Sequence, residues 1–142
     1  MLFAKRERTI RRILVVEDEP LVAFDNEHLL GEAGYEVVAT VDTLAEAARV
    51  LKSEEVDLVL CDIGLNGEGD GLDVARVAAA QGVTVLFVSG DAPPDAHGLA
   101  MGCLAKPYSG KGLKSALETL DLTLQGRAVK KLPRGLSLYT AP

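Results

Sequence analysis

Chemically capable side chains follow four short apolar runs of the sequence. Glu17 and Asp18 come directly after the first run, and Asp62 ends the third. Ser89 ends the fourth run, and Lys106 follows the fifth. This set suits phosphoryl transfer to a carboxylate, because a carboxylate can act as a nucleophile and form an aspartyl phosphate. Lys106 would neutralise one phosphoryl oxygen, and Ser89 would donate a hydrogen bond to another.

A divalent cation is the expected cofactor of this chemistry, because an incoming phosphoryl group and a carboxylate repel each other. Mg²⁺ prefers hard oxygen ligands, commonly one or two carboxylates together with waters and phosphate oxygens. We expect Asp18 and Asp62 to bind Mg²⁺ directly and Glu17 to bind it through water or from further out. A backbone carbonyl just past Asp62, that of Gly64, is expected to complete the metal site.

The elements that must position these residues alternate in type along the chain. Nearly continuous apolar runs predict strands buried on both faces, as in parallel sheets, at residues 13–16, 37–41, 58–61, 83–88 and, more weakly, 103–105. Stretches with helical spacing lie at 20–33, 43–53, 71–81 and 109–124. The alternation predicts an α/β fold with a doubly wound, five-stranded parallel sheet. Ligand chemistry in such folds lies outside the carboxyl ends of the strands, which is where the five residues stand.

Three segments lack a regular pattern. Residues 93–101 begin with two prolines and contain glycine, so we expect a short or mobile element there in place of a good helix. We expect residues 1–11 to form a basic N-terminal tail, and residues 125–142 a C-terminal tail too short for an output domain, around a domain at 12–124. The C-terminal tail could dock on the domain or on a partner, and disorder fits equally well. Within residues 132–139 this tail carries the apolar side chains Leu132, Leu136, Leu138 and Tyr139.

Composition narrows the possible classes of protein. The length of 142 residues suits one compact domain, and the formal charge of −6 argues against general nucleic-acid binding. Cys61 and Cys103 stand singly in apolar runs, so we expect neither a zinc site nor a structural disulfide. The sequence has no signal-peptide h-region and no apolar stretch long enough for a membrane span, so we expect a cytoplasmic location.

The ordered motifs resemble the receiver domain of two-component response regulators. The matching segments are Val15–Pro20, Asp57–Asp62, Val88–Gly90 and Leu104–Tyr108, and the resemblance covers roughly residues 12–124. It implies a flavodoxin-like fold with strand order 2-1-3-4-5, and Asp62 as a phosphoacceptor that uses Mg²⁺. It implies a sensor histidine kinase or a histidine phosphotransfer protein as donor and a downstream target protein that the sequence does not name. It also implies a monomer or weak homodimer without enzyme activity beyond self-phosphorylation and autodephosphorylation.

Three features depart from the usual receiver pattern. Cys103 stands three residues before the lysine, where the family usually has a Tyr or Phe. In the family, that ring and the hydroxyl residue reorient and change the face formed by the fourth helix, the fifth strand and the fifth helix. The segment between Ser89 and Lys106 is short, and the loop after Asp62 is rich in glycine and lacks the customary proline. Atypical receivers from bacterial stress-response and phosphorelay pathways look similar. Because Cys103 replaces the usual ring, we expect Ser89 and the local backbone to couple phosphorylation to the output face.

Two other functions fit part of the pattern. Phosphatases resembling haloacid dehalogenases also use an Asp nucleophile on a parallel sheet, but they typically carry a second Asp two residues later, where this chain has Gly64. The alternative is a constitutive receiver-like binding module that phosphorylation does not regulate. Each residue alone would commonly be a helix cap, a loop hydroxyl or a solvated lysine. The combination of Asp18, Asp62, Ser89 and Lys106 therefore carries the hypothesis.

Overall fold

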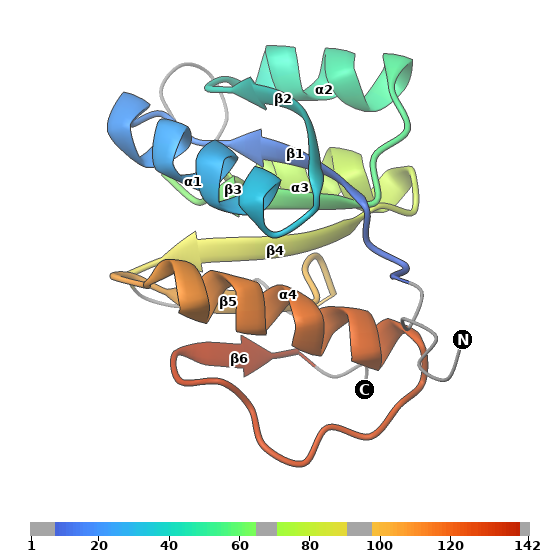
Figure 1. Ribbon diagram of the computed structural model, residues 1–142. Helices are drawn as coiled ribbons and strands as arrows, with labels where there is room; N and C mark the ends of the chain where they lie inside the picture. The colour runs from blue at the N-terminus through green and yellow to red at the C-terminus, as the bar shows by residue number, and fades with distance from the viewer. Residues whose placement is uncertain (1–7, 65–70, 91–97, 140–142) are drawn as a thin grey trace, which may run out of the picture.

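The computed structural model describes residues 8–64, 71–90 and 98–139, which form one sheet flanked by helices (Figure 1). The strands are β1 (Arg12–Val16), β2 (Glu36–Val41), β3 (Leu58–Asp62), β4 (Thr84–Ser89), β5 (Gly102–Ala105) and β6 (Leu136–Leu138). The helices are α1 (Pro20–Glu32), α2 (Leu44–Ser53), α3 (Gly71–Ala80) and α4 (Gly110–Leu124). The apolar runs and the helical spacing in the sequence thus predicted these segments to within a few residues, except β6.

The sheet has the strand order β2-β1-β3-β4-β5-β6. The first five strands are parallel and follow the predicted order 2-1-3-4-5. The sheet is six-stranded rather than five-stranded, however, and β6 runs antiparallel to β5. The additional strand comes from within residues 125–142, the expected tail. Its physical basis is the open edge of β5, whose backbone donors and acceptors would otherwise lack strand partners.

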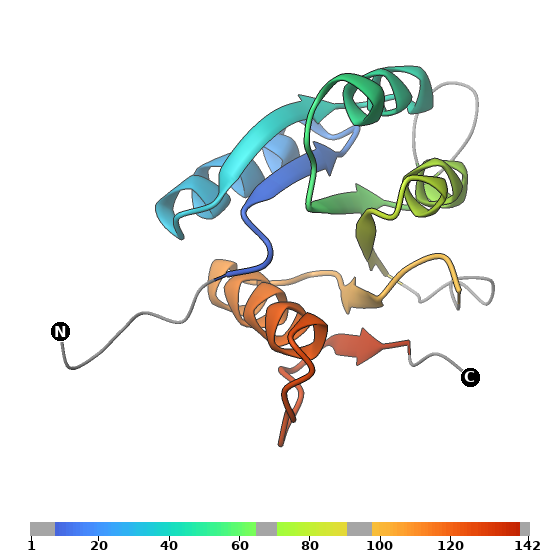
Figure 2. The ribbon, with the colours of Figure 1, turned by 90° about the vertical axis from the view of Figure 1, so that its right-hand side faces the viewer.

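Two apolar layers hold the helices against the sheet. Helices α1 and α4 cover one face and α2 and α3 the other, as the edge-on view shows (Figure 2). Alternate residues of the strands point into opposite layers, so that Val15 and Leu60 join the α1/α4 layer while Val16 and Cys61 join the α2/α3 layer. Burial on both faces explains why the strand sequences are continuously apolar.

Side chains cap the starts of two helices, and a glycine turn follows a third. The side chain of Thr43 caps α2: it accepts a hydrogen bond from the backbone N–H of Glu46 at 3.2 Å and donates one to the Glu46 carboxylate at 3.3 Å. Ser109 caps α4 by accepting a hydrogen bond from the Gly112 N–H. After α1 the chain reverses at Gly34, whose φ of +93° is a conformation that favours glycine. The two N-caps mark where α2 and α4 begin, and the turn at Gly34 marks where α1 ends.

Part of the expected N-terminal tail packs onto the domain. Ile10 is fully buried in the α1/α4 layer. The backbone N–H groups of Thr9 and Ile10 both donate to the carboxylate of Asp121, which is itself buried in α4. Residues 8–11 therefore belong to the packed structure, whereas residues 1–7 lie outside the described part of the chain.

The connection that enters β5 is irregular. The expected short or mobile element at 93–101 falls largely on residues 91–97, which are not among the described ones. Residues 98–101 form a turn and a strand bridge, with no helix. They pack Leu99 and Ala100 onto the α2/α3 layer, on the same face as Cys103.

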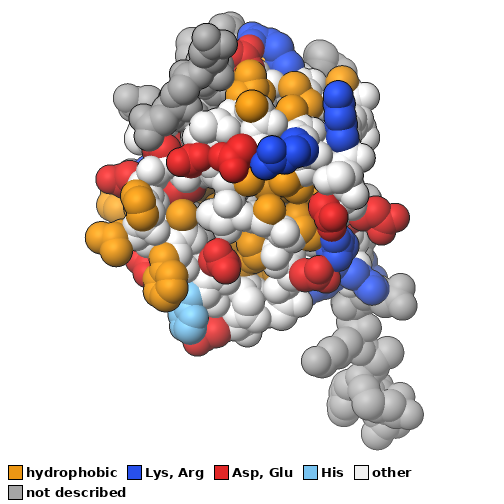
Figure 3. Space-filling model, turned by 90° about the horizontal axis from the view of Figure 1, so that it is seen from above, with side chains coloured by type: hydrophobic (Ala, Val, Ile, Leu, Met, Phe, Trp, Pro, Cys, Tyr) orange, Lys and Arg blue, Asp and Glu red, His pale blue; other side chains and the backbone are white. Residues whose placement is uncertain are grey.

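The surface of the described residues is mixed in character. Acidic and basic side chains are interspersed on the face seen in Figure 3, and apolar side chains lie both at its left edge and across its middle. On α1, Leu21 and Phe24 are 80% and 69% exposed. Among the described residues, no helix has both the length and the apolar character needed to cross a membrane.

Candidate functional site

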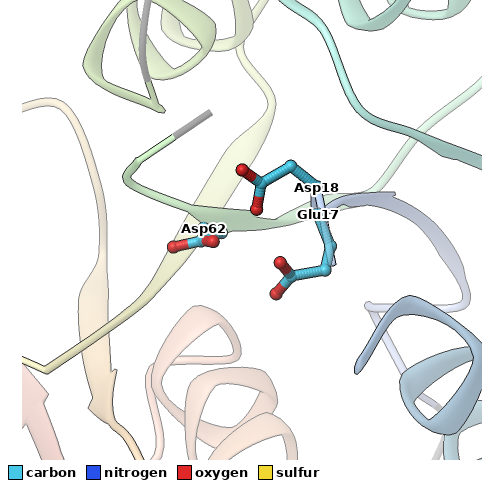
Figure 4. A group of neighbouring side chains, drawn as sticks. All are labelled: Glu17, Asp18 and Asp62. Carbon is cyan, nitrogen blue, oxygen red and sulfur yellow. The ribbon is translucent and has the colours of Figure 1, made fainter. Parts of the chain in front are cut away.

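Three carboxylates meet at the carboxyl edge of the sheet. Glu17 and Asp18 follow β1 directly, and Asp62 is the last residue of the adjacent strand β3 (Figure 4). Each offers one oxygen such that these oxygens all lie within 4.8 Å of one another. The predicted acidic cluster is therefore present, because two neighbouring parallel strands end at the same level.

Backbone hydrogen bonds fix the turn that carries the first two acids. The N–H of Glu17 donates to the carbonyl of Val41 in β2 at 2.9 Å, so that β1 stays paired to its end. One oxygen of the Glu17 carboxylate accepts a hydrogen bond from the Glu19 N–H at 3.1 Å. Pro20 then begins α1. Glu17 is consequently turned inward and buried, while Asp18 is half-buried.

Lys106 brings a positive charge to this cluster. Its Nζ lies 3.4 Å from Oδ2 of Asp62 and 3.6 Å from Oε1 of Glu17. The backbone N–H of Lys106 donates to the carbonyl of Ser89 at 2.9 Å, which ties the end of β5 to the end of β4. The peptide bond between Lys106 and Pro107 is cis. The lysine side chain therefore lies over the carboxyl edge of the sheet, close to Asp62 and Glu17.

Burial and charge act in opposite directions on the ionisable groups of the site. Burial raises the pKa of Glu17 to about 7, with the charge of Asp62 adding to that effect against the Glu19 N–H and Lys106. Burial acts to lower the pKa of Lys106, but the charges of Glu17 and Asp62 outweigh it and the pKa is raised. Lys106 therefore stays protonated, whereas Glu17 exchanges a proton near neutral pH. With Glu17 ionised, Glu17 and Asp62 carry more negative charge than Lys106 neutralises, so a further cation can bind beside them.

The remaining predicted residues stand at the same edge. Ser89 ends β4 next to β5, opposite Ala105, and is half-buried. Gly64 is exposed and lies two residues beyond Asp62, at the end of the described segment. Their predicted roles, a hydroxyl donor to a phosphoryl group and a carbonyl ligand of Mg²⁺, stay predictions.

Two hollows adjoin the cluster. One, of about 290 Å³, is lined by Glu17 and Asp18 together with Asp42 and Glu46, which extends the acidic character of the edge toward β2 and α2. The other, of about 530 Å³, lies between α1 and the segment after β5 and includes Lys106 in its lining. The lysine and the acids are therefore approachable from outside.

Sequence reasoning missed one contact that supports the lysine. The hydroxyl of Tyr108 donates a hydrogen bond to Oδ1 of Asn26 at 2.9 Å, joining the loop after β5 to α1 across 82 positions of sequence. Asn26 is buried, and burial raises the pKa of Tyr108 although the bond to Asn26 opposes the shift. The available signal was a polar Asn on an otherwise apolar side of α1, facing a Tyr two residues past the lysine.

A model of a known family matches most of the folded part of the chain. It is the model of the response regulator receiver domain, and the match covers residues 13–118. The chain belongs to this family. Receiver domains are signalling modules of two-component systems that interact with histidine kinases or phosphotransfer proteins, and in general they are not enzymes. They typically bind Mg²⁺ at an acidic pocket.

Related proteins place the receiver among bacterial regulators. The chain is 32% identical over 114 residues to the transcriptional regulatory protein PdtaR of Mycobacterium tuberculosis, a match that covers 76% of this chain and 55% of PdtaR. It is 35% identical over 79 residues to the phyllosphere-induced regulator PhyR of Methylorubrum extorquens, covering 54% of this chain and 30% of PhyR. The chain thus spans about half or less of the curated relatives it matches first.

Solved structures of receivers share the fold. SdrG from Sphingomonas melonis Fr1 has a TM-score of 0.65 and 30% identity, with 80% of this chain and 98% of SdrG covered. The receiver domain of the sensor histidine kinase PA1611 from Pseudomonas aeruginosa PAO1 has a TM-score of 0.67 and 25% identity, with 78% and 96% covered. That structure holds a magnesium ion coordinated in its active site cleft.

Proposed function

We propose that this receiver accepts a phosphoryl group on Asp62 with the help of Mg²⁺ and signals through contacts with other proteins. The observation that carries the proposal is the position of Lys106, whose Nζ lies 3.4 Å from Asp62 and 3.6 Å from Glu17 beside a group of three carboxylates. A structural ion pair would need one acid for one base. A site with surplus negative charge and a fixed lysine suits the binding of a cation together with a phosphoryl group.

The residues present fit Mg²⁺. Oε1 of Glu17 is buried and has no hydrogen-bond partner among the described residues, with Lys106 as its neighbour at 3.6 Å. The donor set consists of carboxylate oxygens, the hard ligands that Mg²⁺ prefers. Asp18 and Asp62 would hold the ion, with Glu17 acting through water and the Gly64 carbonyl as a further ligand. When bound, the ion offsets the repulsion between the acids and an incoming phosphoryl group.

The phosphoryl transfer itself needs few protein groups. One oxygen of the Asp62 carboxylate attacks phosphorus and forms a P–O bond while the bond from phosphorus to the donor's imidazole nitrogen breaks. The electron pair stays on that nitrogen, and because the other ring nitrogen of the phosphohistidine already carries a proton, the donor is left as neutral histidine. Lys106 offsets charge on the phosphoryl oxygens, and the Ser89 hydroxyl donates a hydrogen bond to one of them. Loss of the group by hydrolysis would reset the protein.

The donor and the target define the signalling role. We propose a sensor histidine kinase or a histidine phosphotransfer protein as donor, and an unidentified protein as target. The protein would act as a monomer or weak homodimer, without nucleic-acid or membrane binding and in the cytoplasm. Residues 12–124 would form the working unit together with the flanking segments that pack on it.

Backbone amide spectra test the site directly. Mg²⁺ with beryllofluoride, which mimics a phosphoryl group on a carboxylate, should shift the amide signals of Asp62, Ser89 and Lys106 when added to the full chain. Asp62→Asn should abolish the shifts, and the matched variant Asp73→Asn, on the outer side of α3 beside Arg76, should keep them. A wild-type protein whose signals stay unchanged would favour the constitutive binding module instead.

A further inference from the structure

The strand β6 is a small addition to a large sheet. It pairs with β5 over three positions, with Leu136 opposite Leu104 and Leu138 opposite Gly102. Leu136 is buried, whereas Leu138 is only partly buried. Short edge elements with few buried apolar contacts open locally at much lower cost than the central strands. The structure thus covers the edge of β5 with an element that separates easily.

A tyrosine of this segment reaches the position where the usual receiver aromatic is absent. Tyr139 packs on the α2/α3 layer, with its side chain beside that of Cys103. Burial and the contact with Cys103 raise the pKa of Tyr139 to about 12, so the hydroxyl stays protonated at neutral pH. The ring that β5 lacks in its own sequence is therefore supplied from the other side of its edge.

The same strand edge is linked to the phosphorylation site through one residue. The N–H of Ala105 donates to the carbonyl of Gly135 at 2.8 Å, immediately before Lys106. Lys106 is held by Asp62 and Glu17. A phosphoryl group on Asp62 extends beyond the carboxylate, so the lysine must follow it outward. That movement would act on Ala105 and on its hydrogen bond to Gly135, the residue just before β6.

The edge beneath β6 suits an extended peptide. With β6 absent, β5 would present free N–H and C=O groups, which is the geometry that binds an added strand. Gly102 allows close approach, since a Cβ there would lie 2.6 Å from the carbonyl oxygen of Ser137. The pattern of β6 defines the fitting sequence: an uncharged segment with apolar residues at alternate positions, such as Leu136 and Leu138, followed by an aromatic.

We propose that residues 135–139 form a displaceable strand, and that phosphorylation of Asp62 releases it so that an extended segment of a partner protein pairs with β5 in its place. This inference rests on the proposed function. The inference goes beyond the proposed function because it assigns a binding surface, which is the backbone edge from Met101 to Ala105. It also assigns the chemistry of the partner segment.

Hydrogen exchange of single amides in the full chain tests the release. The N–H groups of Ala105 and Tyr139 bond across the β5–β6 edge, to Gly135 and Met101, whereas the N–H of Met101 bonds to Val85 in β4. With Mg²⁺ and beryllofluoride, exchange of the first two amides should accelerate at least tenfold, while exchange of the Met101 amide changes less than twofold. Tyr139→Ala should accelerate the same two amides severalfold without beryllofluoride, because it removes the ring that packs on the α2/α3 layer.

A peptide copying residues 133–139 tests the vacated edge. It should bind the full chain at least tenfold more tightly with Mg²⁺ and beryllofluoride than with Mg²⁺ alone, and a peptide with Asp in place of both leucines should not bind. Shifts at Asp62 together with unchanged exchange at Ala105, or with unchanged peptide affinity, would overturn this inference and leave the proposed function standing. Absence of any shift at Asp62 would overturn both.

Discussion

The carboxyl edge at β1 and β3 and the outer edge of β5 are built in different ways. At the first, two fully paired central strands deliver Glu17 and Asp62 from buried backbone, and only the side chains carry charge. At the second, a three-residue strand is held by a few hydrogen bonds and by Tyr139. The first edge is therefore suited to hold charged groups at fixed distances, and the second to change its partner. Lys106 and Ala105, adjacent in sequence, connect them.

The largest effect is expected on the rate of phosphorylation, from removing the positive charge of Lys106 at the carboxyl edge of β1 and β3. Lys106→Met should slow phosphorylation by a small-molecule phosphodonor about 100-fold, because no other cationic side chain among the described residues forms an ion pair with Asp62 or Glu17. Rates are measured by intact mass against time. The control is Lys111→Met, in the first turn of α4 and outside the carboxylate cluster. A rate that stays within threefold of the wild type would contradict the role of Lys106.

The buried acid of the first edge should make stability depend on pH. Because the pKa of Glu17 is raised from 4.5 to about 7 in the folded state, the folded protein binds a proton more tightly than the unfolded chain does. The free energy of unfolding should therefore fall as pH rises from about 4.5 to 7, by up to about 3 kcal/mol, and then level off.

Denaturant titrations at pH 5 and pH 8, with a chelator present, measure this fall. Glu17→Gln should remove most of it, since the variant carries no ionisable group at this position. Mg²⁺ at pH 8 should stabilise the wild type more than the variant, because only the wild type has an ionised Glu17 beside the ion. An identical pH dependence in both proteins would show that Glu17 is not the titrating group.

An added methyl group at Gly102 tests how closely β6 packs against β5. Gly102→Ala would place a Cβ 2.6 Å from the carbonyl oxygen of Ser137, so β6 must shift or detach. We expect a loss of about 1–3 kcal/mol in unfolding free energy and unchanged phosphorylation of Asp62. In the matched variant Gly31→Ala, the new Cβ meets no atom within 4 Å. The free energy of unfolding should therefore stay unchanged or rise by up to about 1 kcal/mol, because alanine favours the helix. Equal effects of the two substitutions would contradict a tight β5–β6 contact.

The smallest expected effect concerns the support behind the lysine. Tyr108→Phe removes the hydroxyl that donates to Asn26 and leaves a buried amide oxygen without that donor. A double-mutant cycle with Asn26→Ala should give a coupling energy of about 1 kcal/mol. A coupling near zero would mean that the two residues contribute independently.

The two edges also differ in how far the sequence predicted them. The first edge follows from local rules, because an acid that ends a buried parallel strand must appear at the carboxyl side of the sheet. Glu17, Asp18, Asp62 and Lys106 could be brought together on that basis alone. The helices were equally readable, since the Thr43 cap and the apolar spacing are contained within each segment.

The second edge depends on partners that are distant in sequence. A three-residue strand is too short to show a period, and whether residues 136–138 pair with β5 depends on the free edge that the rest of the fold creates. The contact between Tyr139 and Cys103 and the burial of Ile10 against α4 arise in the same way. The sequence suggested that the C-terminal leucines could dock on the domain, but not where they would do so.

Phosphorylation of Asp62 can be measured by the intact mass of the full chain after incubation with Mg²⁺ and acetyl phosphate. We expect one added phosphoryl group that requires Mg²⁺, persists in Asp73→Asn and is absent in Asp62→Asn. Phosphorylation by a histidine phosphotransfer protein, run in parallel, covers the case of a receiver that ignores small donors. A protein that gains no phosphoryl group from either donor, or that gains one equally in Asp62→Asn, would contradict this expectation.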